Sequence, residues 1–121
     1  MAYSEEPRWS KQKLERKASA LNSPITGGQD ILPSPLAPSN LPLATFRIYA
    51  CFSAAGTLTL RRTRSGGTVG EVLNISEGLM GAGGAYIFEV IVEEGDTINL
   101  RYSVTCTCIR LIVGEVAVVT S

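Results

Sequence analysis

All six prolines and all three lysines of this chain lie within its first 42 residues, and residues 43–121 contain neither. Proline removes a backbone N–H donor and fixes φ at about −65°, so this stretch can neither join a central strand nor run as one long helix. From Thr45 onward, apolar residues alternate with polar ones and glycines recur between the apolar runs. This division predicts an N-terminal arm, residues 1–44, followed by a compact β domain, residues 45–121.

The first half of the arm, residues 4–21, has the features of a short helix. Ser4 is a suitable N-cap residue, and two glutamates follow it, where the positive end of a helix dipole favours acidic side chains. Leu14, Ala18 and Leu21 recur at helical spacing. A helix this short is marginal in water, so we expect it to dock on a surface.

The second half of the arm, residues 22–44, combines five prolines with interleaved leucine and isoleucine. Such spacing favours an extended or polyproline conformation. A solvated linker would be richer in glycine, serine or charge. We expect the segment to lie along a groove of its own domain or of a neighbour, and a disordered tether is the alternative. The arm side chains expected to contact a partner are Trp9, Leu14, Leu21, Ile25, Ile31, Leu32, Leu36, Leu41 and Leu43.

The domain contains six runs with a period of two, which is the period of strands. No helical stretch interrupts them, so the fold class is all-β. Many short strands separated by turns favour a compact antiparallel β-sandwich. A bulge is expected at Gly114, where the alternation of the last run changes phase. The expected strands are Thr45–Phe52, Thr57–Arg64, Thr68–Ile75, Ala85–Glu93, Asp96–Val104 and Thr107–Val119.

Composition argues against several functions. Histidine is absent, which removes the commonest general base and the commonest zinc ligand. The net charge is zero, unlike the basic footprint of nucleic-acid-binding proteins. The N-terminus has no basic region followed by an apolar stretch, and no run approaches the roughly 18 apolar residues of a membrane span. We therefore expect no enzyme activity, cofactor, metal, membrane contact or direct nucleic-acid contact, and synthesis in the cytoplasm.

The glycine-rich loop at residues 78–84 contains two large apolar side chains, Leu79 and Met80. A phosphate-binding loop opens a helix and brings a lysine, whereas this loop precedes a strand and has none. It can also be simply a mobile turn whose glycines supply positive φ. Because exposed apolar side chains at a loop tip are unfavourable, we expect Leu79 and Met80 to contact a neighbouring subunit or a host surface.

Three cysteines, Cys51, Cys106 and Cys108, are too few for a zinc site without histidine. The phase of their strands puts all three opposite the main apolar face. A disulfide from Cys51 to Cys106 or Cys108 is possible if the first and last strands of the domain are neighbours. Otherwise they are small, semi-buried apolar residues beneath the arm or at an interface.

Charged residues cluster in two places. Arg61, Arg62 and Arg64 form a basic patch, with Arg47 near it, that could meet an acidic partner or phosphate. A solvated face, or a strand edge guarded against unwanted pairing, is the simpler interpretation. The acidic residues of the turn at 93–96 are most simply solvated.

The stretch from Phe88 to Ser103, FEVIVEEGDTINLRYS, has an alternating strand, a Gly-Asp turn and a second alternating strand. This pattern resembles jelly-roll domains of the complement-C1q and tumour-necrosis-factor-like fold. It is also similar to the small β-sandwich proteins that decorate or spike viral capsids. The resemblance implies a trimer-forming jelly roll.

Two functions fit these observations. The first is a non-enzymatic structural assembly protein, most simply a virion component such as a capsid decoration, cementing or small spike protein. It would attach to a capsid lattice through its arm and oligomerise through its β domain, with a homotrimer favoured. The second is a binding module for a carbohydrate or host receptor, although Tyr49, Tyr86 and Tyr102 are the only tyrosines in the domain and the last two are expected to face inward.

Overall fold

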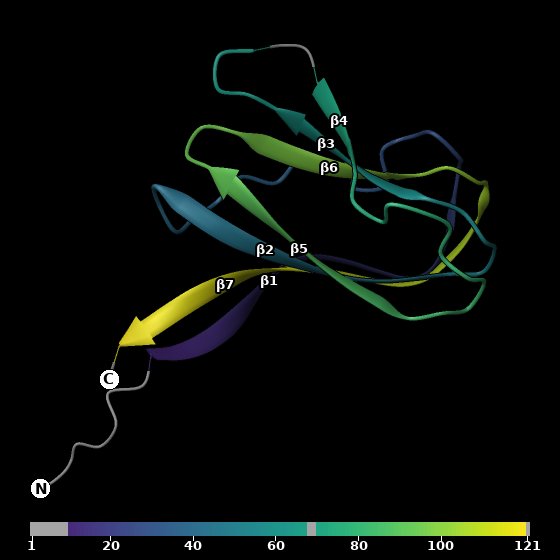
Figure 1. Ribbon diagram of the computed structural model, residues 1–121, viewed down its shortest axis with the longest axis horizontal. Coiled ribbons are helices and arrows are strands. Elements are labelled where there is room, and N and C mark those ends of the chain that lie inside the picture. Colours follow the sequence, from purple (N-terminus) through teal and green to yellow (C-terminus); the bar gives the residue numbers. More distant parts are fainter. Residues whose placement is uncertain (1–9, 68–69, 121) are drawn as a thin grey trace, which may run out of the picture.

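Seven strands form two antiparallel sheets in the computed structural model, which describes residues 10–67 and 70–120 (Figure 1). The larger sheet has the order β1-β7-β2-β5, and the smaller has the order β4-β3-β6. The prediction of an all-β chain with two antiparallel sheets is confirmed. The strands are β1 (Ser10–Ile25), β2 (Leu43–Phe52), β3 (Leu58–Thr63), β4 (Gly70–Asn74), β5 (Tyr86–Glu93), β6 (Thr97–Tyr102) and β7 (Cys106–Thr120).

The core lies between the two sheets and follows the predicted alternation. Every second residue of β2, from Phe46 to Phe52, is at most 1% exposed. Leu58 and Leu60 of β3 and Leu100 of β6 meet them from the opposite sheet and are equally buried. Each fully buried aliphatic or aromatic side chain of this kind contributes roughly 1.5–3 kcal/mol. This core is what holds the two layers together.

The predicted helix is wrong for residues 10–21, because they belong to β1, and residues 4–9 lie outside the described residues. β1 pairs with β7 over its whole length. Its register slips by one residue at Lys17, since Arg16 pairs with Gly114 and Ala18 pairs with Val113. Because of this bulge, the side chains that face the core follow one alternation before Lys17 and the opposite alternation after it. The resulting spacing of apolar residues imitates that of a helix.

The proline-rich segment lies against its own chain. The backbone N–H of Ile31 donates to the carbonyl of Leu100 at 2.8 Å, and Leu36 and Ile98 exchange two hydrogen bonds of 2.8 and 2.9 Å. Leu32 is 5% exposed, and the side chain of Asn99 both accepts from its N–H and donates to its carbonyl. Residues 28–36 therefore cover the free edge of β6 and shield the core there.

The segment is also fastened farther along the chain by Glu115, whose side chain is completely buried. Its carboxylate accepts hydrogen bonds from the backbone N–H groups of Ser39 and Asn40 at 2.5–2.9 Å, and from the Asn40 side-chain amide at 2.5 Å. The ammonium of Lys17, presented by the bulge in β1, lies 3.3 Å from the same carboxylate. Burial alone raises the pKa of Glu115, but these hydrogen bonds outweigh it and leave the pKa below its ordinary value.

The expected bulge at Gly114 is instead between Arg110 and Cys108. Along the β2–β7 pair, Cys51 faces Arg110 and Phe52 faces Cys108, so Ile109 is the extra residue. Cys108 is therefore turned into the core, where it is fully buried, and Glu115 keeps the inward phase of Val113.

Candidate functional site

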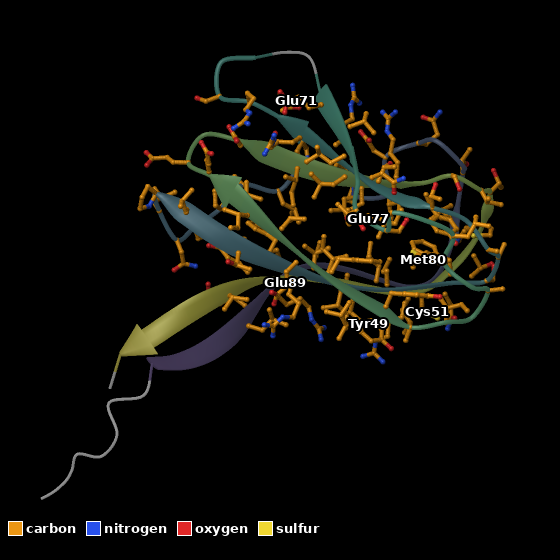
Figure 2. All side chains as sticks on the ribbon, in the orientation of Figure 1. Tyr49, Cys51, Glu71, Glu77, Met80 and Glu89 are labelled. Atoms are coloured by element: carbon orange, nitrogen blue, oxygen red, sulfur yellow. The ribbon has the colours of Figure 1, made fainter. Side chains whose placement is uncertain are left out.

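The outward face of the four-stranded sheet is the surface that points away from the three-stranded sheet. Tyr49 and Cys51 of β2 project from it (Figure 2). The antiparallel registers arrange its side chains in rows that run across all four strands. We define the outward face by three such rows: Leu14, Val116, Thr45 and Ile91; Arg16, Gly114, Arg47 and Glu89; and Ser19, Ile112, Tyr49 and Ile87.

The first and third rows leave large apolar side chains in contact with water. Leu14 is 44% exposed, Ile91 is 62% exposed and Ile87 is 63% exposed. Leu43 and Leu21, at the two ends of the same face, are also exposed. Isolated exposed apolar residues are ordinary on protein surfaces, but a contiguous group marks an interaction site. On the outward face the exposed apolar residues lie on its two outer strands, β1 and β5, and at its ends.

The middle row consists of three charged residues and one glycine. The guanidinium of Arg47 binds the carboxylate of Glu89 at 2.7–2.8 Å, so these two charges neutralise each other across β2 and β5. Beside them, Gly114 leaves room for the side chain of Leu14, since a Cβ at Gly114 would lie 2.5 Å from Leu14 Cγ. Arg16 adds a positive charge to this row, and two surface hollows lie on the same face, one beside Leu21 and one beside Leu43.

The opposite side of the sandwich is different in character. On the outward side of the three-stranded sheet, Asp30 pairs with Arg101 at 2.7 Å and with Arg61 at 3.9 Å. Arg62 pairs with Glu71 at 2.8 Å, and this hydrogen bond lowers the pKa of the exposed Glu71 carboxyl despite the opposing effect of desolvation. The basic patch expected at 61–64 is thus neutralised by carboxylates. Arg47, expected near this patch, lies on the other sheet.

The acidic turn after β5 is only partly solvated, contrary to expectation. Asp96 is 3% exposed, and its carboxylate accepts a hydrogen bond from the backbone N–H of Ser65 at 3.1 Å. Arg64 donates to the same carboxylate at 3.2 Å and lies 3.7 Å from Glu93. The turn joins the ends of β3, β5 and β6, and its role is structural.

The structure separates the predicted partner-binding residues into two groups. Leu14, Leu21 and Leu43 lie on the outward face. Leu41 and Leu79 are exposed elsewhere, with Leu79 at 76%. Trp9 lies outside the described residues. Two expectations are corrected: Leu32 and Met80 are buried in the core of this chain, at 5% and 2% exposure. Three others, Ile25, Ile31 and Leu36, are partly buried against the same core.

The glycine-rich surroundings of Met80 predict a loop tip, but its backbone exchanges two hydrogen bonds with Gly56 at 2.7 and 3.2 Å. This bridge turns the methionine inward (Figure 2). Its neighbour Leu79 is left at the tip.

All three cysteines are free thiols in the structure. Cys51 is on the outward side of β2, as its phase predicts. The prediction fails for Cys108, which the bulge turns into the core, and Cys106 packs against the same core. Burial raises the pKa of the Cys108 thiol to about 11, so this group is not a nucleophile at neutral pH.

The aromatic side chains offer little for stacking a ligand. Tyr102 is fully buried and stacks on Phe52 with 3.8 Å between ring centroids, and its hydroxyl donates to the carbonyl of Ala54 at 2.6 Å. Tyr86 accepts a hydrogen bond from the Gly81 N–H. Tyr49 is the partly exposed tyrosine of the outward face.

Among the described residues, no three histidine, cysteine or acidic side chains are grouped so that they could hold a metal ion. That part of the chain also contains no helix long and apolar enough to cross a membrane. No protein-family model matches the chain, and a search of curated proteins returned no match.

Proposed function

We propose that this chain is a non-enzymatic structural assembly protein, most simply a virion component that decorates, cements or spikes a capsid. The observation that carries this proposal is the outward face of the four-stranded sheet, which exposes large apolar residues on β1, β2 and β5, whereas those of the three-stranded sheet are confined to Val72 and Leu73 of β4. Leu14 and Leu21 of the N-terminal segment contribute to the same surface as the β domain. The proposed oligomerisation surface therefore includes part of the N-terminal segment.

We further propose that the fold is a jelly roll. The strand order supports this when residues 28–36, which bridge to β6 at Asp30–Arg101 and Leu36–Ile98, are counted as a strand. The chain then has eight strands in two sheets of four, β1-β7-β2-β5 and (28–36)-β6-β3-β4. Jelly rolls of eight strands in two sheets occur in viral capsid and lectin domains. This architecture is compatible with a capsid-associated role, and the proposed function rests on the outward face rather than on the fold.

Energetics support association through the outward face. Burying one exposed isoleucine or leucine contributes roughly 1.5–3 kcal/mol, and a closed symmetric oligomer repeats each contact in every interface. A standard interface buries about 800 Å² per partner, roughly an eighth of the 6779 Å² surface of the chain. A homotrimer is the oligomer that the sequence resemblance implies.

The test compares matched charge substitutions on the two sheets. Ile87→Glu and Ile91→Glu place a carboxylate on the outward face, and Val72→Glu places one on β4, where Val72 is equally exposed at 64%. Sedimentation velocity is run over a concentration series of each protein, and electron microscopy follows the binding of each to capsid-sized particles. The two isoleucine variants are expected to associate at least about a hundredfold more weakly, because each tenfold loss needs only about 1.4 kcal/mol.

Val72→Glu is expected to associate like the unmodified protein. Equal weakening by Val72→Glu, or an unmodified protein that stays monomeric and ignores particles, would contradict the proposal. Binding of a glycan array that depends on Tyr49 would favour a carbohydrate-binding module instead.

A further inference from the structure

The paired termini form a ribbon that leaves the body of the sandwich. β2 pairs with β7 only up to Val116, which faces Thr45. β1 continues beside β7 from there to the pair Ser10–Thr120. Over residues 117–120, β7 therefore has β1 on one side, and on its other side no described strand is paired with it. The two strands extend away from both sheets (Figure 1).

A two-stranded ribbon of this kind is marginally stable in water, and an unpaired strand edge presents a row of N–H and C=O groups ready to bind another strand. The two edges of this ribbon differ in sequence. Over residues 10–13 the β1 strand of the ribbon reads Ser-Lys-Gln-Lys, and lysine is typical of strand edges that are protected against further pairing. The β7 strand reads Val-Ala-Val-Val-Thr over residues 116–120, with no charge and no proline. The unguarded edge is the one on β7.

Space for a further strand begins where the sheet divides. A surface hollow beside that point is lined by Leu43, Ala44, Thr45 and Arg47 of β2, Val116 of β7, Glu89 of β5 and Asn40. A strand added beside residues 117–120 would begin there, in line with β2. An uncharged segment with high β-propensity suits this edge best, because residues 116–120 of β7 carry no charge that could pair with a charged residue of an added strand.

We propose that the partner at this edge is a second copy of the chain, bound by antiparallel pairing of residues 117–120 with the same residues of the other copy. The same segment of another copy is uncharged, extended and has the same open edge, so a two-fold axis satisfies both edges at once. The pairing joins β1 and β7 of two copies into one continuous four-stranded ribbon.

This inference rests on the proposed function in taking a copy of the chain as the partner, but it uses a different surface. Contacts through the outward face close an oligomer, and contacts through the ribbon edge link one oligomer to the next. Two independent contacts of this kind are what an extended lattice requires.

The test uses a pair of substitutions at facing positions of the ribbon in the full-length protein. Val118→Lys adds a charge to the β7 strand, and its control Gln12→Lys adds one to the β1 residue that pairs with Val118. Sedimentation over a concentration series is expected to show that oligomers of Val118→Lys associate with one another at least tenfold more weakly than those of the unmodified protein. Gln12→Lys is expected to associate like the unmodified protein. Equal weakening by both variants would mean association through the ribbon's faces and would overturn edge pairing. No effect from Val118→Lys would also overturn it.

Residue-resolved hydrogen exchange gives a second measurement that does not depend on a substitution. Antiparallel pairing protects those amides of residues 117–120 that point away from β1, and only at concentrations where copies associate. Protection that is the same at high and low concentration would assign the edge to a segment of the same chain and overturn the proposal. If Ile87→Glu abolishes closed oligomers while Val118→Lys changes nothing, the edge pairing fails and the proposed function stands.

Discussion

Replacing Glu115 by alanine is the perturbation for which the structure gives the clearest expected magnitude. The carboxylate is completely buried and satisfies the N–H groups of Ser39 and Asn40 together with the ammonium of Lys17. A buried donor left without a partner costs about 1–3 kcal/mol, but water can reach the exposed Ser39. Counting only the Asn40 amide groups and Lys17, we expect Glu115→Ala to lower the free energy of unfolding by about 3 kcal/mol.

Thermal and urea denaturation followed by circular dichroism measure this loss, at one protein concentration for all variants because association also stabilises. A loss of 3 kcal/mol corresponds to roughly 12 °C in Tm for a domain of this size. Glu115→Gln keeps the side-chain volume and one acceptor oxygen, but its amide N–H groups face other hydrogen-bond donors. We therefore expect its free energy of unfolding to be lower by about 2 kcal/mol. The matched control is Glu89→Gln, which breaks an exposed ion pair and should cost less than about 1 kcal/mol.

The same carboxylate predicts a pH dependence. The pKa of Glu115 is lower in the folded protein than in the unfolded chain, where it has its ordinary value. At a pH between these two pKa values, the unfolded chain therefore binds more protons than the folded protein. Its stabilisation is complete above the unfolded pKa and is lost as the pH falls through the folded pKa. The difference in stability between the unmodified protein and Glu115→Gln should therefore shrink below about pH 4. If Glu115→Ala stays within 0.5 kcal/mol of the unmodified protein at pH 7, roughly the limit for an ordinary surface change, the argument is refuted.

Three further outcomes are expected. Tyr102→Phe removes the 2.6 Å hydrogen bond to the Ala54 carbonyl and should cost about 1 kcal/mol in urea denaturation, and an unchanged midpoint would contradict this. Gly27→Ala would bring a Cβ to 2.9 Å from the backbone atoms Ser103 O and Thr105 N, so it should destabilise the fold by more than about 1 kcal/mol. At the neighbouring Gly28 an added Cβ would meet no atom within 4 Å, and the cost of Gly28→Ala is the strain of its positive φ of 76°. At pH 8 an alkylating reagent should modify partly exposed Cys106 first and Cys108 only on unfolding, as mass spectrometry can show, and early modification of Cys108 would contradict its burial.

The β domain was predictable because its strands alternate cleanly. β2 exposes one face and buries the other from Phe46 to Ala50, and the six expected strands of the domain all occur, with bounds within a few residues of the prediction. The period of two survives there because each strand has one side on the core.

The N-terminal strand could not be predicted in the same way. Its bulge at Lys17 breaks the alternation, and Pro24 argued against a strand. Because β1 is an edge strand, proline is tolerated there, which a sequence without a known sheet order does not reveal. The pairing of β1 with β7 spans almost the whole chain, so no local pattern encodes it.

Glu115 carried a signal that went unused. Glu115 follows Leu111 and Val113 at a constant spacing of two, so an unbroken strand alternation puts this glutamate on the same side as the two apolar residues. The expected bulge at Gly114 concealed it. The outward face was not recognised from sequence because its rows combine residues from four strands distant along the chain, and only the registers bring Leu14, Ile91 and Ile87 onto one surface.

The central claim is that copies of this chain assemble through the outward face of the four-stranded sheet. The most direct measurement is the native mass of the full-length protein over a range of concentrations, with Ile87→Glu measured beside it. The account predicts a discrete oligomer for the unmodified protein, with a trimer favoured, and a monomer for Ile87→Glu. A monomer of 12.9 kDa at every concentration, or an oligomer that Ile87→Glu leaves intact, would contradict it.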